Sequence, residues 1–153
     1  MSYANDSESQ SINLNPQSSF VVDLILERFC REHPFVMFGQ LAKSLRIIDG
    51  NELVDLIESA TDEGVLNDHE RDDLFLLDAI AKGKDKNSGS DLYLAVEASS
   101  VADEHDLERA LRRAQLLTKA TGTAALPVIA SDIAAKGILA LAESRGVYWV
   151  SRG

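Results

Sequence analysis

The fold is decided by a stretch in the middle of the chain, residues 74–98, which reads LFLLDAIAKGKDKNSGSDLYLAVEA. Two short, nearly all-apolar runs, 74–81 and 92–98, stand on either side of a polar loop that contains glycine. Apolar runs of about four to eight residues, bounded by turn-forming residues, are typical of buried β-strands. The stretch therefore predicts a β-hairpin with its loop over residues 82–91.

After the hairpin, the chain alternates between helical and extended patterns. Asp103 precedes an acidic first turn, as expected of a helix N-cap, and Pro127 places the strand around it near a sheet edge or a bulge. With the hairpin, the order is β-β-α-β-α-β, which predicts an α/β domain over residues 67–153. The four elements expected after the hairpin are a helix at 103–122, a strand at 124–130, a helix at 132–145 and a strand at 147–150.

The N-terminal half has a helical pattern. Residues 1–18 are rich in Ser, Asn and Gln with few apolar groups, so we expect a disordered tail there. The region 19–66 predicts about three α-helices, and an acidic connector at 67–73 leads into the α/β domain. The expected helices are 20–31, 35–45 and 52–63, the first ended by Pro34 and the last by Gly64.

The charge of the chain is divided unevenly between its halves. Residues 1–73 carry 15 acidic and 5 basic side chains, whereas residues 74–153 carry 10 of each. The expected helix at 52–63 has five acidic residues and no Lys or Arg, so phosphate would repel it, and we expect nucleic-acid binding to be weak or absent. The helical region predicts a homodimer or another protein contact instead, through an apolar surface made of Val21, Leu24, Phe29, Phe35, Phe38 and Leu41.

The expected localisation follows from the apolar stretches, the N-terminal charges and the single cysteine of the sequence. No apolar stretch reaches the roughly 18 residues needed to span a bilayer, and no Lys or Arg precedes Arg28. The single cysteine, Cys30, lies in an apolar run, which favours a core residue over a nucleophile. These features predict a cytoplasmic protein without membrane contact.

Two carboxylates occupy the hairpin strands. If the loop is centred near residues 86–87, Asp78 lies opposite Ala95 and Glu97 is its diagonal neighbour on the same face. Such neighbours are about 7–8 Å apart at Cα, so both carboxylates can reach one hard cation. Asp78 and Glu97 are therefore candidate ligands for Mg²⁺ or Mn²⁺.

An acidic residue late in one strand, a second strand ending in Glu-x-Lys and a following helix make up the pattern of PD-(D/E)XK nucleases, which this chain resembles from 73 to 150. Asp78 matches the metal-binding aspartate and Glu97 the second acid. The resemblance implies a restriction-endonuclease-like mixed sheet and metal-dependent cleavage of nucleic acid. Ser99 stands where the superfamily has its lysine, similar to an uncharacterised bacterial branch with Glu-x-Ser at this point. A hydroxyl cannot supply the positive charge of that lysine.

Other residues could assist or replace this chemistry. Gln115 is similar in placement to a glutamine that assists several PD-(D/E)XK branches, and Lys119 or Arg112 could replace the lysine. Alternatively these side chains form a solvated helix face. Glu97 either binds metal or pairs with Arg112 or Arg113, and Asp78 either binds metal or closes a strand end.

Two functions follow from these patterns. The first is an interaction or regulatory protein on a nuclease-like fold whose catalysis is lost or weakened. The second is a Mg²⁺-dependent nuclease that uses Asp78, Glu97, Gln115 and Lys119. The hairpin-loop lysines, Lys82, Lys84 and Lys86, either contact phosphates or remain solvated beside Asp85. Scattered histidines and the lack of a glycine-rich turn argue against a zinc enzyme and a Rossmann site.

Overall fold

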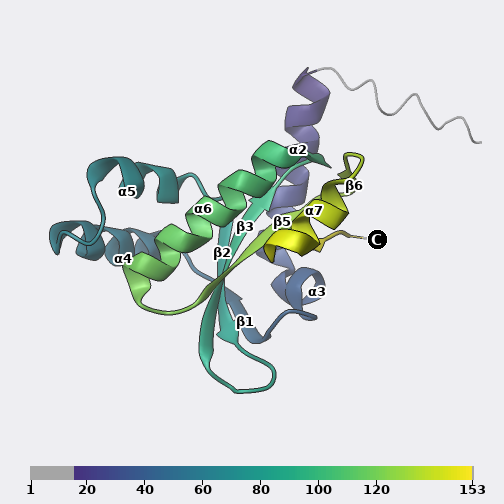
Figure 1. Ribbon diagram of the computed structural model, residues 1–153. Coiled ribbons are helices and arrows are strands. Elements are labelled where there is room, and N and C mark those ends of the chain that lie inside the picture. Colours follow the sequence, from purple (N-terminus) through teal and green to yellow (C-terminus); the bar gives the residue numbers. More distant parts are fainter. Residues whose placement is uncertain (1–15, 153) are drawn as a thin grey trace, which may run out of the picture.

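A five-stranded mixed sheet forms the centre of the molecule, in the order β1-β2-β3-β5-β7 (Figure 1). The computed structural model describes residues 16–152. The strands of this sheet are β1 (Lys43–Ile47), β2 (Ala79–Lys84), β3 (Asp91–Ala98), β5 (Ala125–Ala130) and β7 (Tyr148–Val150). Two further short strands, β4 (Val101–Ala102) and β6 (Ile133–Ala134), pair with each other.

Six helices are present in the described part of the chain, so the α/β class is confirmed. They are α2 (Pro16–Glu32), α3 (Pro34–Phe38), α4 (Gly50–Asp62), α5 (Asp68–Phe75), α6 (Glu104–Thr121) and α7 (Ile138–Arg145). None of the helices in residues 16–152 is long and apolar enough to cross a membrane. The expected tail falls largely on residues 1–15, which lie outside the described residues, while residues 16–18 begin α2.

The β2–β3 hairpin is present, but its first strand is shorter than expected. Residues 74 and 75 end helix α5, which begins where an acidic connector was predicted. Asn67 and Glu70 form a capping box in which each side chain accepts a hydrogen bond from the other residue's backbone N–H. This cap fixes the start of a helix whose own apolar pattern is weak.

The register of the hairpin also differs from the prediction. Ala79 pairs with Val96 and Lys84 with Asp91, so Asp78 stands next to Glu97 rather than opposite Ala95. The partner has moved by two residues, which keeps the same side chains on the same face. The loop is fixed by the Asp85 carboxylate, which accepts hydrogen bonds from the backbone of Asn87 and Ser88 at 2.8 Å each.

The strands that follow the hairpin are parallel to β3. Helix α6 connects β3 to β5, and α7 leads into β7. The helix expected at 132–145 begins only at Ile138, because residues 133–134 form β6, which pairs with β4. Pro127 was expected near a sheet edge or a bulge, and β5 lies between β3 and the edge strand β7. β5 pairs with β7 only from Val128 onward, so the proline, which lacks an N–H, precedes the end of that ladder.

Strand β1 replaces the second half of a predicted helix. The apolar spacing after Pro34 predicts a helix to Leu45, but α3 ends at Phe38, and the chain then forms a strand antiparallel to β2. Phe38 and Ala42 are fully buried, so the apolar pattern marks burial correctly although the element is wrong. Phe38 therefore does not belong to the exposed apolar surface predicted for a homodimer, and Phe29 and Leu41 pack against the same core. The region 19–66 is thus not entirely helical, because it contains β1, which pairs with the edge of β2 that β3 leaves open.

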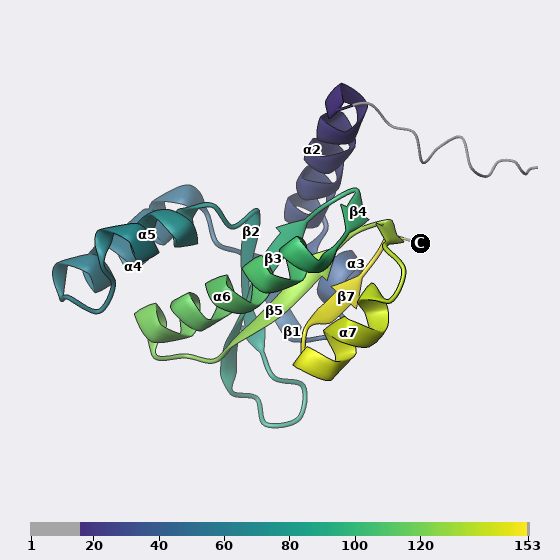
Figure 2. The ribbon, with the colours of Figure 1, turned by 45° about the horizontal axis from the view of Figure 1, so that its top comes forward.

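Helices cover both faces of the sheet (Figure 2). On one face α2 and α3 pack on alternate residues of β2 and β3, with Leu26, Cys30 and Phe38 against Ala81, Leu94 and Val96. On the other face α4, α5 and α6 pack on the intervening residues, with Ile57, Leu74 and Leu117 against Ile80 and Ala95. Further along that face, α6 and α7 pack on β5, with Leu107, Ala110, Ile138 and Ala142 around Ile129.

Close packing of β1 on β2 can be tested at Gly83. A Cβ atom at this position would lie 2.9 Å from Leu45 Cδ2 and 2.9 Å from the backbone oxygen of Lys43. We expect Gly83→Ala to lower the free energy of unfolding by about 1–3 kcal/mol in urea denaturation, because a backbone oxygen cannot move aside cheaply. Gly50→Ala is the control, with no atom within 4 Å, and it should change stability by under about 1 kcal/mol. Equal stability of the two variants would contradict this register.

Candidate functional site

The two predicted carboxylates lie side by side where β2 begins and β3 ends. The backbone N–H of Asp78 donates to the oxygen of Val96 at 3.2 Å, and Asp78 Oδ2 accepts from the N–H of Ala98 at 2.7 Å. These two hydrogen bonds attach Asp78 on both sides of Glu97. The prediction that the two acids are neighbours is therefore met, through a closer pairing than the diagonal one expected.

Glu97 is bound by arginine. Its carboxylate is buried, with 3 % of the residue exposed, and both oxygens accept from Arg113 Nη1 at 3.0 Å. Arg109 Nε lies 3.4 Å from Oε1 of the same carboxylate. Of the two arginine partners proposed from the sequence, Arg113 pairs with Glu97, and Arg112 does not.

Asp73 extends this ion pair into a network. Its carboxylate accepts from Arg113 Nε at 3.0 Å and from Arg112 at 2.6 and 3.2 Å. Asp73 lies near the end of α5, so the network joins α5, β3 and α6. Sequence reasoning missed Asp73 and Arg109, because Asp73 belongs to an acidic run in which no local pattern singles it out.

Burial sets the electrostatics of this cluster. Desolvation raises the pKa of Glu97, while Arg113 and Arg109 act in the opposite direction. Desolvation also raises the pKa of Asp78, to about 7, with a further increase from the neighbouring Glu97 charge. The hydrogen bond from Arg112, by contrast, holds the pKa of Asp73 below its ordinary value. Asp78 thus has a pKa close to neutral pH.

Ser99, at the lysine position of the resembled pattern, serves the backbone. Its hydroxyl donates to the oxygen of Val101 at 3.0 Å, and its N–H donates to the oxygen of Ala130 at 3.0 Å. The next residue, Ser100, donates its N–H to Asp23 Oδ1 on α2 at 2.5 Å. Ser99 therefore fixes the turn between β3 and β4, and contributes no positive charge.

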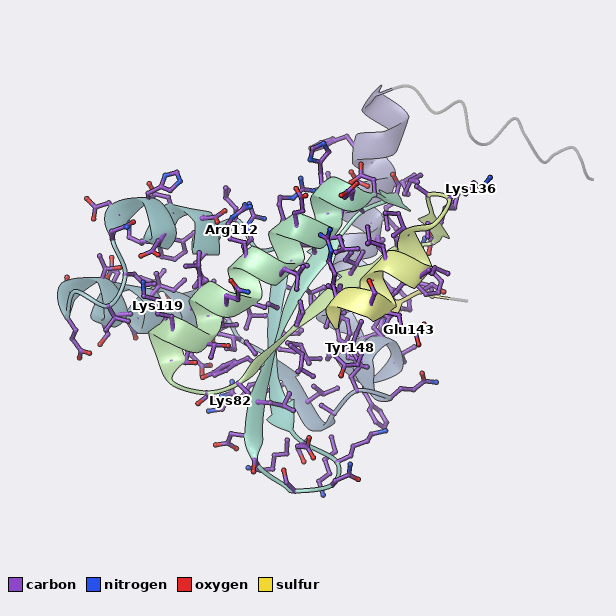
Figure 3. The ribbon with its side chains drawn as sticks, in the orientation of Figure 1. Lys82, Arg112, Lys119, Lys136, Glu143 and Tyr148 are labelled. Carbon is purple, nitrogen blue, oxygen red and sulfur yellow. The ribbon has the colours of Figure 1, made fainter. Side chains whose placement is uncertain are left out.

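The two predicted helpers on α6 lie elsewhere. Lys119 Nζ is 3.3 Å from Glu70 Oε2 on α5, and Figure 3 shows Lys119 and Arg112 along the α6 surface beside α5. Gln115 is exposed and lines a shallow groove of about 230 Å³ with Thr118 and Pro127. Neither Lys119 nor Gln115 thus contacts Asp78 or Glu97 in the described part of the chain, which favours the alternative of a solvated helix face.

The other residue considered for chemistry is Cys30. It lies on α2 and is fully buried against the sheet, and desolvation raises the pKa of its thiol to about 12. A thiol with this pKa carries almost no thiolate at neutral pH. Its position as a core residue agrees with the sequence-based interpretation.

The Asp78–Glu97 pair is a poor fit for a divalent cation in this arrangement. A Mg²⁺ ion would sit about 2.1 Å from each ligand oxygen, but both Glu97 oxygens already accept from a guanidinium. Arg113 supplies at Glu97 the positive charge that the resemblance assigns to metal. Among residues 16–152, no three His, Cys, Asp or Glu side chains are grouped around one position for an ion.

No family model, curated protein or solved structure matches this chain. By its fold and its site, the chain is an α/β protein with a mixed sheet and a buried carboxylate–guanidinium network at the junction of β2 and β3.

The network predicts the effect of removing the Glu97 charge. We expect Glu97→Gln to lower the free energy of unfolding by about 3–5 kcal/mol, because it leaves the buried Arg113 with Asp73 alone. Replacing both residues together, as Glu97→Gln with Arg113→Met, should cost less than the sum of the single changes. Chemical denaturation of the four proteins in a double-mutant cycle measures this coupling. Additive losses would show that the pair is not formed.

The raised pKa of Asp78 predicts a pH dependence. Its pKa is about 7 in the folded chain against an ordinary 3.8, so between these values the folded state holds a proton that the unfolded state has released. Stability from this group is therefore full below about pH 4 and decreases as pH rises to about 7. Thermal unfolding across this range should show a smaller decrease for Asp78→Asn than for the wild type.

Asp91→Asn is the control for this measurement. Lys84 lowers the pKa of Asp91, so Asp91 titrates below the range in question and its removal should leave the decrease unchanged. Some decrease should remain in Asp78→Asn, because the pKa values of Glu97 and Asp106 are also raised. Identical pH profiles for Asp78→Asn and Asp91→Asn would contradict the assignment.

Proposed function

We propose that this chain is an intracellular interaction or regulatory module built on a PD-(D/E)XK nuclease-like fold, with catalysis lost or weakened. In this proposal it forms a homodimer through α2 and α3. The observation that carries it is the contact of Arg113 with both oxygens of Glu97, because it occupies the acid that a nuclease would use for metal.

The order of elements supports the nuclease-like part of the proposal. Strands β1, β2 and β3 form an antiparallel meander, and α6 then leads to β5, which is parallel to β3. Glu97 lies on β3, and Asp78 directly precedes β2. Element order defines a fold, whereas activity depends on the residues of the site.

The site supports loss or weakening of catalysis at two points. Phosphoryl chemistry needs a positive group beside the scissile phosphate, and Ser99 at the lysine position donates its hydroxyl to a backbone oxygen. Two cations of the site, Arg109 and Arg113, pair with Glu97. A guanidinium held by carboxylates stabilises the fold but has little capacity left for a substrate.

The surface of α2 and α3 supports a protein contact. Several large apolar side chains are exposed close together there, and such a patch is typical of a protein-binding surface. The exposed fractions are 62 % for Phe20, 47 % for Leu24, 52 % for Ile25, 73 % for Phe35 and 69 % for Val36. Phe20, Leu24 and Ile25 lie on α2 and Phe35 and Val36 on α3, and their exposure leaves them open to a partner.

A second copy of the chain is the partner that we propose for this face. From residue 20 onward, α2 exposes Phe20, Leu24 and Ile25, and Arg28, with 78 % of its side chain exposed, lies one turn after Leu24. In an antiparallel pairing about a two-fold axis near Leu24, Phe20 meets the partner subunit's Arg28. The long arginine stem and a cation–π contact suit that pairing. An isologous interface of this kind closes as a dimer.

The alternative is a Mg²⁺- or Mn²⁺-dependent nuclease that uses Asp78 and Glu97. The adjacency of the two carboxyls favours it, since Glu97 raises the pKa of Asp78 and a cation between them would relieve that repulsion. Calorimetric titration with Mn²⁺ separates the two functions. We expect no saturable heat; a one-to-one heat that Glu97→Gln removes, with cleavage of DNA, would establish the alternative.

The homodimer predicts a defined change of mass. Light scattering at tens of micromolar should give a dimer for the wild type and a monomer for Leu24→Glu, because a buried charge opposes the apolar contact. Leu139→Glu on α7 is the matched control, since Leu139 is 46 % exposed against 47 % for Leu24. A monomeric wild type, or equal effects of the two changes, would contradict the dimer.

A further inference from the structure

The pairing of β1 with β2 concentrates positive charge at one end of the sheet. In register, Lys43 stands opposite Lys84 and Arg46 opposite Lys82. Like charges directly opposite each other destabilise an antiparallel pair. This chain has a net charge of -10, so two such cationic pairs are not explained by its composition. The sequence alone shows only the lysines of β2, because β1 was expected to be a helix.

Three of these cations, Arg46, Lys82 and Lys84, line a groove of about 310 Å³. Its lining consists of Ser44, Arg46, Lys82, Gly83, Lys84 and Asp91. Ser44 lies in the bulge of β1 with φ of 57°, a left-handed conformation that is unusual for a residue other than glycine. Backbone strain of this kind is concentrated at binding and catalytic sites. The groove thus combines strained backbone, a hydroxyl and three cations.

The cations of the groove are only partly neutralised. Arg46 pairs with Glu52 of α4 at 2.8 Å, and Lys84 pairs with Asp91 at 2.6 Å. Both pairs are exposed, so each contributes little and can exchange for another anion. Lys82 Nζ lies 5.7 Å from the centre of the Tyr93 ring. Within residues 16–152, neither Lys82 nor Lys43 has a carboxylate within ion-pair distance.

We propose that this groove binds a compact polyanion, namely a short chain of phosphate groups such as inorganic tripolyphosphate or the triphosphate of a nucleotide. Residues two apart on a strand are about 6.6 Å apart, and neighbouring strands are about 4.8 Å apart, so Lys82, Lys84 and Arg46 surround a region a few phosphates long. Arg46 can contact two oxygens of one phosphate, while the lysines act as point charges.

A compact ligand is favoured over a long nucleic acid by what borders the groove. Helix α4 begins beside Arg46 and carries Glu52, Asp55 and Glu58 along its length. A duplex extending past the groove would meet this acidic helix and be repelled. In this proposal a short phosphate chain lies between Ser44 and Lys84 and reaches α4 only at Glu52. The phosphate takes the place of Glu52 as the partner of Arg46.

Binding can be tested by calorimetric titration of the full chain with tripolyphosphate, and separately with ATP, at low ionic strength. We expect saturable binding that weakens with added salt. Lys82→Gln should bind about tenfold more weakly, whereas Lys82→Arg should bind nearly as well as the wild type. Lys136→Gln is the charge-matched control and should leave affinity unchanged, because Lys136 lies on the opposite side of the molecule from Lys82 (Figure 3).

The outcomes distinguish the ligand sources. Equal affinity for tripolyphosphate and ATP supports recognition of the phosphate chain alone, and tighter binding of ATP supports a nucleotide. Absence of heat with both compounds at millimolar concentration would overturn the proposal, as would equal weakening by Lys82→Gln and Lys136→Gln. Tighter binding of duplex DNA than of either compound would also overturn it. Thermal unfolding of each variant shows whether a lost signal reflects a lost fold.

Discussion

The buried pair of Glu97 and Arg113 is the interaction on which the central part of this structure depends. Glu97 ends the middle strand of the sheet, and Arg113 lies on the helix that crosses it, with Asp73 bringing a third element to the same guanidinium. Removing either charge would leave the other in a low-dielectric site, at a cost that neighbouring apolar contacts could not offset. The pair thus fixes how α6 and α5 sit on β3, and it also decides what chemistry the two acids can perform.

The elements that follow local patterns were predictable from the sequence. The hairpin at 79–98, the capped helix α6, the strands β5 and β7 and the helix α7 each depend on apolar periodicity, a cap or a glycine. The short strand β6 was not predicted, because its residues fell in the helix expected at 132–145. β1 and α5 were not predictable. The apolar spacing around Phe38 and Ala42 suits a buried helix and a buried strand equally, and only pairing with β2 selects the strand. Helix α5 depends on its capping box, in a segment whose charge suggests a connector.

The candidate site was also predictable only in part: the pair of acids could be predicted, but their arginine partner could not. That Asp78 and Glu97 are neighbours follows from strand alternation, and a register error of two residues preserves it. Which arginine reaches Glu97 does not follow, because Arg109, Arg112 and Arg113 are close together on one helix. Their choice of partner depends on the rotation of α6 over the sheet and on the position of Asp73. Such contacts join segments far apart in the chain and leave no periodic signal.

The placement of β1 has a consequence for the order in which the molecule assembles. The turn between β2 and β3 is short, so that hairpin can form with little loss of chain entropy. Pairing β1 with β2 instead encloses the whole segment that carries α4 and α5. Contacts that close longer loops form more slowly. We therefore expect the hairpin to act as a template onto which the N-terminal part of the chain attaches late, so that the cationic groove between β1 and β2 exists only in the fully assembled protein.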